Sequence, residues 1–61
     1  MYKVIINKSF DVVFNDESSL IHYLELSRDN FGNDFLNNLE VYEYDERRNA
    51  FVLTELSNYI D

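Results

Sequence analysis

The sequence predicts an α+β fold, a two-layer sandwich in which one helix covers an antiparallel sheet in the order ββαββ. Apolar and polar side chains alternate in residues 2–14 and again in 39–54, with the period of two that is typical of strands. Residues 16–32 instead place apolar side chains three and four positions apart, as an amphipathic helix does. A chain of 61 residues has room for a single domain, which we take to span 1–61.

Residues 2–14 are expected to form a β-hairpin. Six apolar side chains alternate along it: Tyr2, Val4, Ile6, Phe10, Val12 and Phe14. A three-residue turn, Asn7–Ser9, places all six on one side of the sheet, whereas a two-residue turn mixes the two faces. Ser9 is then expected to take the left-handed conformation of such a turn. Ile5 and Val13 are expected to be paired neighbours on the outer side, as an exposed patch or as a second buried surface.

Residues 16–32 are expected to form the main helix. Its apolar stripe comprises Leu20, Leu24, Ser27 and Phe31. Asn15 or Asp16 can cap the first turn, and Gly32 suits the left-handed residue that follows a last turn. The opposite side carries His22, Glu25 and Asp29.

The second half is expected to contain a short helical turn or loop at 33–38 and then a second hairpin. Its strands are 39–44 and 50–54, joined by the four-residue turn Glu46–Asn49. This register pairs Tyr44 with Phe51 and Tyr42 with Leu53, and these four large side chains are expected to face the helix. The outer face then carries Val41, Glu43, Val52 and Thr54.

The last residues have helical spacing of their apolar side chains at Leu53, Leu56, Tyr59 and Ile60. We therefore expect a short C-terminal helix with Thr54 as its cap, in preference to a longer strand. The order of the strands in the sheet stays open at this point.

The charge is strongly negative and unevenly distributed. The chain carries −7, and residues 11–61 hold all twelve acidic residues and three of the five basic ones, which gives −9. Such a surface repels DNA, RNA and anionic membranes, because binding them requires Lys or Arg to neutralise phosphates. A basic protein is the expected partner.

No sequence feature points to export or to a membrane. No apolar run approaches the roughly 20 residues of a membrane span. Residues Met1–Asn7 become polar too quickly for a signal peptide, so the expected location is the cytoplasm. The absence of Cys fits a reducing compartment.

No catalytic or metal motif is present. His22 is the one histidine and is expected at the surface; without Cys it cannot build a zinc site. Counted from Asp29, Gly32 falls at position 4 rather than 6, which excludes an EF-hand loop. The carboxylates Glu40 and Glu55 lack a substrate pocket in so small a domain. We therefore expect no enzyme activity, metal or cofactor.

Arg47 and Arg48 are expected to pair locally with nearby acidic residues or, alternatively, to contact a partner.

The candidate site is the acidic second hairpin with its tyrosines. We expect partner-binding residues at Glu40, Tyr42, Glu43, Tyr44, Asp45, Glu46 and Glu55. Carboxylates in a phosphate-like arrangement would imitate nucleic acid, and tyrosines make effective anchors because they lose little conformational entropy on binding. The alternative is a solvated, solubilising face above core tyrosines.

Small size, strong acidity and an Asn-, Ile-, Tyr- and Asp-rich composition resemble small proteins of phages and mobile elements of low-GC Gram-positive bacteria. Among these are anti-CRISPR proteins and other host-enzyme inhibitors, several of which are compact acidic DNA mimics. The resemblance implies a non-enzymatic inhibitor of a basic nucleic-acid-binding host protein, such as an RNA-guided nuclease. The alternative is a structural or assembly module that forms a homodimer or a subunit of a larger complex through its sheet edges or the Ile5/Val13 patch.

Overall fold

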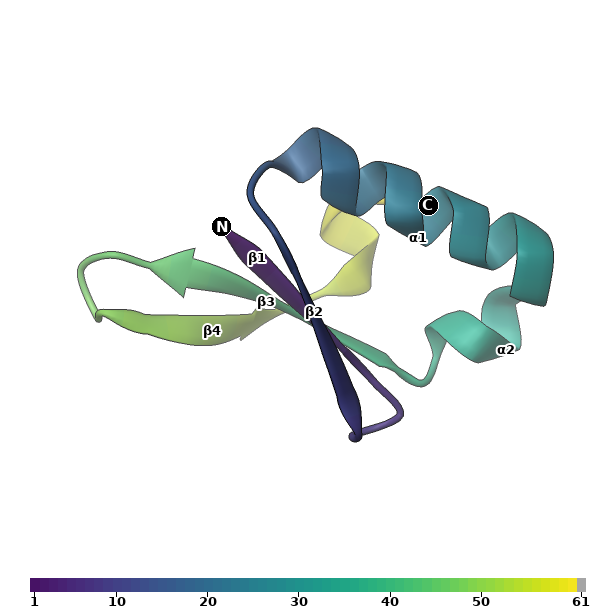
Figure 1. Ribbon diagram of the computed structural model, residues 1–61, viewed down its shortest axis with the longest axis horizontal. Coiled ribbons are helices and arrows are strands. Elements are labelled where there is room, and N and C mark those ends of the chain that lie inside the picture. Colours follow the sequence, from purple (N-terminus) through teal and green to yellow (C-terminus); the bar gives the residue numbers. More distant parts are fainter. Residues whose placement is uncertain (61) are drawn as a thin grey trace.

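A computed structural model describes residues 1–60 of the chain (Figure 1). Its elements are β1 (Tyr2–Ile6), β2 (Phe10–Phe14), α1 (Glu17–Phe31), α2 (Asn33–Leu36), β3 (Leu39–Asp45), β4 (Ala50–Thr54) and a 3₁₀ turn, η1 (Leu56–Asn58). The α+β class, the antiparallel sheet and the single main helix are confirmed. No helix within residues 1–60 combines the length and the apolar character needed to cross a membrane.

The four strands lie in the order β2-β1-β3-β4, and every neighbouring pair is antiparallel. Each hairpin therefore supplies one central strand and one edge strand. The sheet is strongly twisted, as antiparallel sheets are, so the two hairpins point in different directions (Figure 1). The turn of the β3–β4 hairpin projects away from α1 and α2, and we call its end, residues 43–52, the projecting hairpin.

The register of the first hairpin is confirmed, with Val4 opposite Val12 and Ile6 opposite Phe10. The prediction for its turn is wrong in one respect. The left-handed residues are Asn7 (φ 51°) and Lys8 (φ 60°) rather than Ser9, whose N–H donates to the carbonyl of Ile6 at 3.0 Å. Two successive positive φ angles give a turn whose twist matches that of the flanking strands.

Helix α1 begins after Asp16, whose carboxylate accepts a hydrogen bond from the Ser19 N–H at 2.8 Å. This hydrogen bond lowers the pKa of Asp16. The helix ends at Phe31, and Gly32 follows it with φ 85° and ψ 176°. The predicted cap at Asp16 is confirmed, whereas Gly32 has a positive φ but an extended ψ in place of the expected left-handed conformation.

The buried side of α1 carries Leu20, Leu24 and Ser27, as predicted. Phe31 was expected in the same stripe but is 66% exposed. Helix α2 turns back at this end and its Leu36 enters the core instead, while the Phe31 ring lies against Phe35 with 4.9 Å between centroids.

The second hairpin has the predicted register, with Tyr44 opposite Phe51 and Tyr42 opposite Leu53, but it presents the opposite face to the helix. The cause is the pairing of β3 with β1, which sets Val41 opposite Val4. Residues directly opposite in a sheet point to the same side, so Val41 joins Val4 in the core and is 2% exposed.

The core is small and comprises Val4, Leu20, Leu24, Leu36, Leu39, Val41 and Ile60. The predicted C-terminal helix is reduced to the single turn η1, and Thr54 does not cap it. The Thr54 hydroxyl instead donates to the Val41 carbonyl at 2.9 Å and lies 2.9 Å from the Tyr59 hydroxyl. These contacts attach the end of the chain beside β3.

Candidate functional site

The predicted partner-binding residues are divided between the two faces of the sheet. Glu40, Tyr42 and Tyr44 alternate with Val41 and therefore lie on the face away from the helix, whereas Glu43 and Asp45 lie on the same side as Val41. Glu46 is in the turn, and Glu55 follows the end of β4. The seven side chains do not form one continuous surface.

Part of the set does come together on the projecting hairpin. Glu43, Asp45 and Glu46 line an open hollow of about 440 Å³. The rest of its lining is Tyr44, Arg47, Val52 and Thr54. Because this end of the hairpin extends beyond α1, the side that faces the helix elsewhere is accessible here (Figure 1). The result is an acidic hollow, which we define by Glu43, Asp45 and Glu46.

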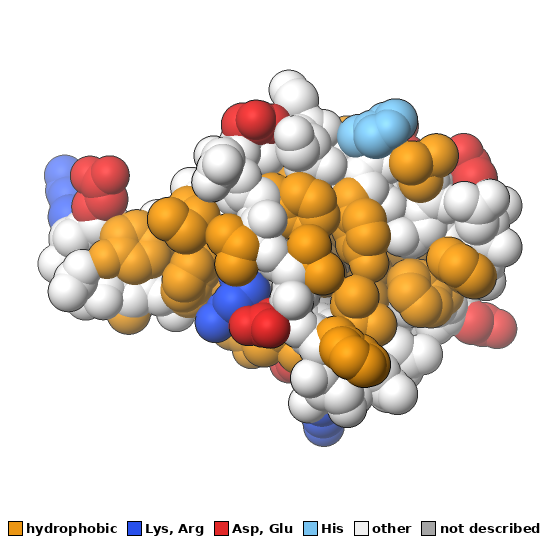
Figure 2. All heavy atoms as spheres, in the orientation of Figure 1, with side chains coloured by type: hydrophobic (Ala, Val, Ile, Leu, Met, Phe, Trp, Pro, Cys, Tyr) orange, Lys and Arg blue, Asp and Glu red, His pale blue; other side chains and the backbone are white. Residues whose placement is uncertain are grey.

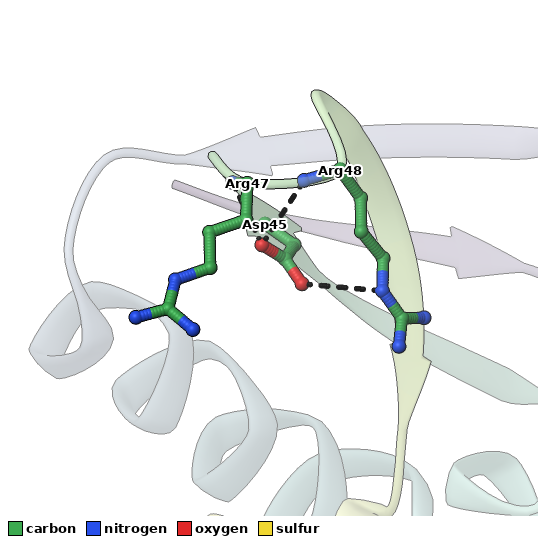
Figure 3. Close-up of polar contacts among 3 residues, drawn as sticks. All are labelled: Asp45, Arg47 and Arg48. Atoms are coloured by element: carbon green, nitrogen blue, oxygen red, sulfur yellow. Dashed lines mark hydrogen bonds and ion pairs between the residues drawn. The ribbon is translucent and has the colours of Figure 1, made fainter.

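The turn that carries this hollow is organised by Asp45 (Figure 3). One carboxylate oxygen accepts hydrogen bonds from the N–H groups of Arg47, at 2.9 Å, and Arg48, at 3.4 Å. The other lies 3.6 Å from Nε of Arg48, and the Arg47 side chain points away from the carboxylate. The predicted local pairing is therefore confirmed for Arg48. Within residues 1–60, Glu43 and Glu46 have no cationic group within 4 Å.

Tyr2 lies beside this hollow, since it pairs with Glu43 across β1 and β3. Desolvation is the largest cause that raises the pKa of Tyr2, followed by the charges of Glu17 and Glu43 and by Tyr59. The Tyr2 and Tyr59 rings meet edge to face, with 5.9 Å between centroids. Tyr2 is thus a neutral, packed residue beside the acidic hollow.

A second candidate surface is the face of the sheet opposite the helix, which we call the uncovered face. It is made of Lys3, Ile5, Asp11, Val13, Glu40, Tyr42, Tyr44, Phe51 and Leu53. Lys3 Nζ lies 4.5 Å from the centroid of the Phe51 ring and 5.6 Å from that of Tyr42. Tyr44 packs edge to face on Phe51, with 5.3 Å between centroids. These contacts form a cation–π and aromatic cluster on a face that no described helix covers.

Tyr42, Tyr44, Phe51 and Leu53 were predicted to face the helix, so the uncovered face was not predicted as one surface. Parts of it were predicted separately, as the partner-binding residues Glu40, Tyr42 and Tyr44 and as the Ile5/Val13 patch. The predicted pairing of Ile5 with Val13 is wrong: the register places Val13 opposite Lys3 and Ile5 opposite Asp11, so the two apolar residues are diagonal neighbours on this face. Figure 2 shows hydrophobic side chains along the projecting hairpin and across the middle of the molecule, with charged side chains at the tip.

His22 is exposed on α1, as predicted. In the described part of the chain, no three His, Asp or Glu side chains are grouped closely enough to hold a metal ion. No protein-family model matches the sequence, and comparisons with curated proteins and with solved structures give no significant match.

Proposed function

We propose that the protein is a non-enzymatic acidic binding protein that docks its projecting hairpin on a basic, nucleic-acid-binding protein, such as an RNA-guided nuclease, and inhibits it. One observation carries the proposal. Glu43, Asp45 and Glu46 share one open hollow on a hairpin that extends past the helix. Two of these carboxylates, Glu43 and Glu46, have no cationic partner among residues 1–60.

The geometry suits entry into a groove built for nucleic acid. Such grooves bind phosphates through Lys and Arg, and an inserted carboxylate competes for the same cations. The projecting hairpin is two strands wide, and Val52 and Tyr44 add apolar contact beside the acids. Association by this route is steered by charge and weakens as salt rises.

The test is binding to purified RNA-guided nucleases, measured by interferometry at several salt concentrations with duplex DNA as competitor. The double variant Glu43→Lys/Glu46→Lys should bind at least about tenfold more weakly, since each new lysine faces cations of the partner. Glu25→Lys/Asp29→Lys makes the same change of charge at two exposed positions of α1 and should bind like the wild type. Salt-insensitive binding, or equal loss in both double variants, would contradict hairpin docking.

A structural or assembly module remains the second candidate function, and the uncovered face favours it. This face exposes Val13 and Leu53 by 52% and 58%, beside a cluster of three aromatic rings. Apolar surface of this kind is typical of contacts between proteins.

A further inference from the structure

Strand β2 forms one edge of the sheet, and its apolar side chains are incompletely covered. Four of its five residues are apolar, and the Phe10 ring is 70% exposed although it lies on the helix side of the sheet. The strand contains neither Lys nor Pro, which commonly keep an edge from pairing with another strand. In Figure 1 β2 passes in front of the other strands, and Figure 2 shows hydrophobic side chains gathered along it.

The backbone groups of β2 that point away from the sheet belong to Asp11 and Val13. Two hydrogen bonds of 2.9 Å join the ends of β1 and β3, from the Asn7 N–H to the Asn38 carbonyl and from the Tyr44 N–H to the Met1 carbonyl. The odd-numbered residues of β1 therefore bond to β3. Because this direction alternates along a strand, the even-numbered residues of β1 bond to β2. Their partners on β2 are Phe10, Val12 and Phe14.

These outward groups are complementary to those of a second copy. A two-fold axis that passes between the Val12 residues of two antiparallel β2 strands sets each Asp11 opposite the other copy's Val13. Residues opposed in this way exchange two backbone hydrogen bonds. Opposed residues also point to the same side, so the two four-stranded sheets become one continuous sheet with both α1 helices on one side.

The same register pairs large side chains on the helix side. Phe10 lies opposite Phe14 of the other copy, and the Phe14 ring already packs on Tyr23 with 5.2 Å between centroids. The exposed Phe10 ring thus gains an aromatic pair, a stabilising contact across two strands. Shifting one copy by two residues would instead set the two Asp11 side chains opposite each other or place Phe10 opposite Asp16.

The charges at the two ends of β2 are also complementary. Lys8 precedes the strand, whereas Asp16 and Glu17 follow it. The two-fold axis brings Lys8 of each copy to the end of the strand that carries the acids of the other. The opposite edge, β4, lacks this advantage. It borders the acidic hollow, so pairing two β4 strands would set two hollows of like charge side by side.

We propose that two copies of this chain pair antiparallel through β2 and form a symmetric homodimer. One strand pair is a small contact and each copy carries −7, so the expected dissociation constant is micromolar. The inference rests on the assembly-module function and names its partner and its surface. It is independent of hairpin docking, because the projecting hairpin lies at the other edge of the sheet.

The test combines sedimentation equilibrium with amide hydrogen exchange of the purified chain, in salt that screens the repulsion between copies. The molar mass should rise from 7.3 kDa toward twice that value as the concentration reaches about 1 mM. The amides of Asp11 and Val13 should become protected over the same range. Those of Phe51 and Leu53, which point outward from β4 by the same alternation, should exchange quickly throughout.

A chain that stays at 7.3 kDa would overturn the proposal and leave hairpin docking untouched. An oligomer that protects the amides of Phe51 and Leu53, but not those of Asp11 and Val13, would also overturn it. That second result would retain an assembly module and move its contact to β4.

Charge variants of Val13 test the register. Val13→Asp sets a carboxylate opposite Asp11 of the other copy and should weaken dimerisation by about tenfold or more. Val13→Lys should dimerise at least as well as the wild type. Within one copy Val13 lies opposite Lys3, so a defect of the monomer would have the opposite sign.

Leu53 provides the matched control, because both side chains are more than half exposed. Leu53→Asp and Leu53→Lys make the same changes of charge on β4 and should alter dimerisation much less. Equal weakening by Val13→Asp and Leu53→Asp would overturn pairing through β2.

Discussion

Replacing Val41 by alanine should destabilise the fold much more than replacing Leu53 by alanine. Val41 is 2% exposed and packs among the core side chains, whereas Leu53 is 58% exposed on the uncovered face. Two lost methyl groups at about 0.8 kcal/mol each, together with the cavity they leave, give about 2–3 kcal/mol for Val41→Ala. Leu53→Ala removes side-chain atoms that are mostly in water, so its cost stays below about 1 kcal/mol.

The free energy of unfolding is measured by urea denaturation followed by far-ultraviolet circular dichroism. A domain of this length has roughly 3–9 kcal/mol of stability, so Val41→Ala removes a large part of it. The midpoint temperature of thermal unfolding should fall by roughly 10–20 °C in Val41→Ala. Each variant is examined at two protein concentrations, because a contribution from self-association depends on concentration. Equal or larger destabilisation by Leu53→Ala in the monomer would show that the face assignment of the second hairpin is wrong.

Three further outcomes are expected. Because its pKa is lowered, Asp16 stabilises the fold above its ordinary pKa of 3.8 and loses that effect as pH falls through the lowered value. Asp16→Asn, which keeps a capping oxygen, should therefore make the free energy of unfolding less sensitive to acid, as measured by denaturation across pH. Gly32→Ala should cost about 1–3 kcal/mol in urea denaturation, through backbone strain alone, because φ is 85° and no atom lies within 4 Å of the added Cβ. Thr54→Val should cost about 1–2 kcal/mol by leaving the Tyr59 hydroxyl without this partner, and hydrogen exchange should show faster opening of residues 56–60.

The local features of the fold could be predicted from the sequence because they depend on neighbouring residues. Alternation fixed the register of the first hairpin, and Asp16 and Gly32 marked the ends of the helix. The conformation of the first turn could not be predicted in the same way. Ser9 was expected to be left-handed because three-residue turns favour such a residue late in the turn, but the chain uses Asn7 and Lys8.

The face of the second hairpin could not be predicted because both of its faces carry apolar side chains. Tyr42 and Leu53 are bulkier than Val41 and Thr54, which favoured the wrong choice. The pairing of β3 with β1 determines which face of the second hairpin lies against the helix, and this pairing joins residues more than 30 positions apart. The candidate site was divided for the same reason, since neighbouring strand residues point to opposite sides.

The position of β1 between β2 and β3 has a consequence for the rate of folding. Its partners on β3 are distant in the sequence, at 33 residues for Ile6 and Leu39 and 41 residues for Tyr2 and Glu43. Each hairpin can form within microseconds from local contacts, but neither is stable alone. Closing the long loop between them is therefore expected to limit the rate. Substitutions at the β1–β3 seam, such as Val41→Ala, should slow folding, whereas substitutions in the turn of the projecting hairpin should mainly speed unfolding.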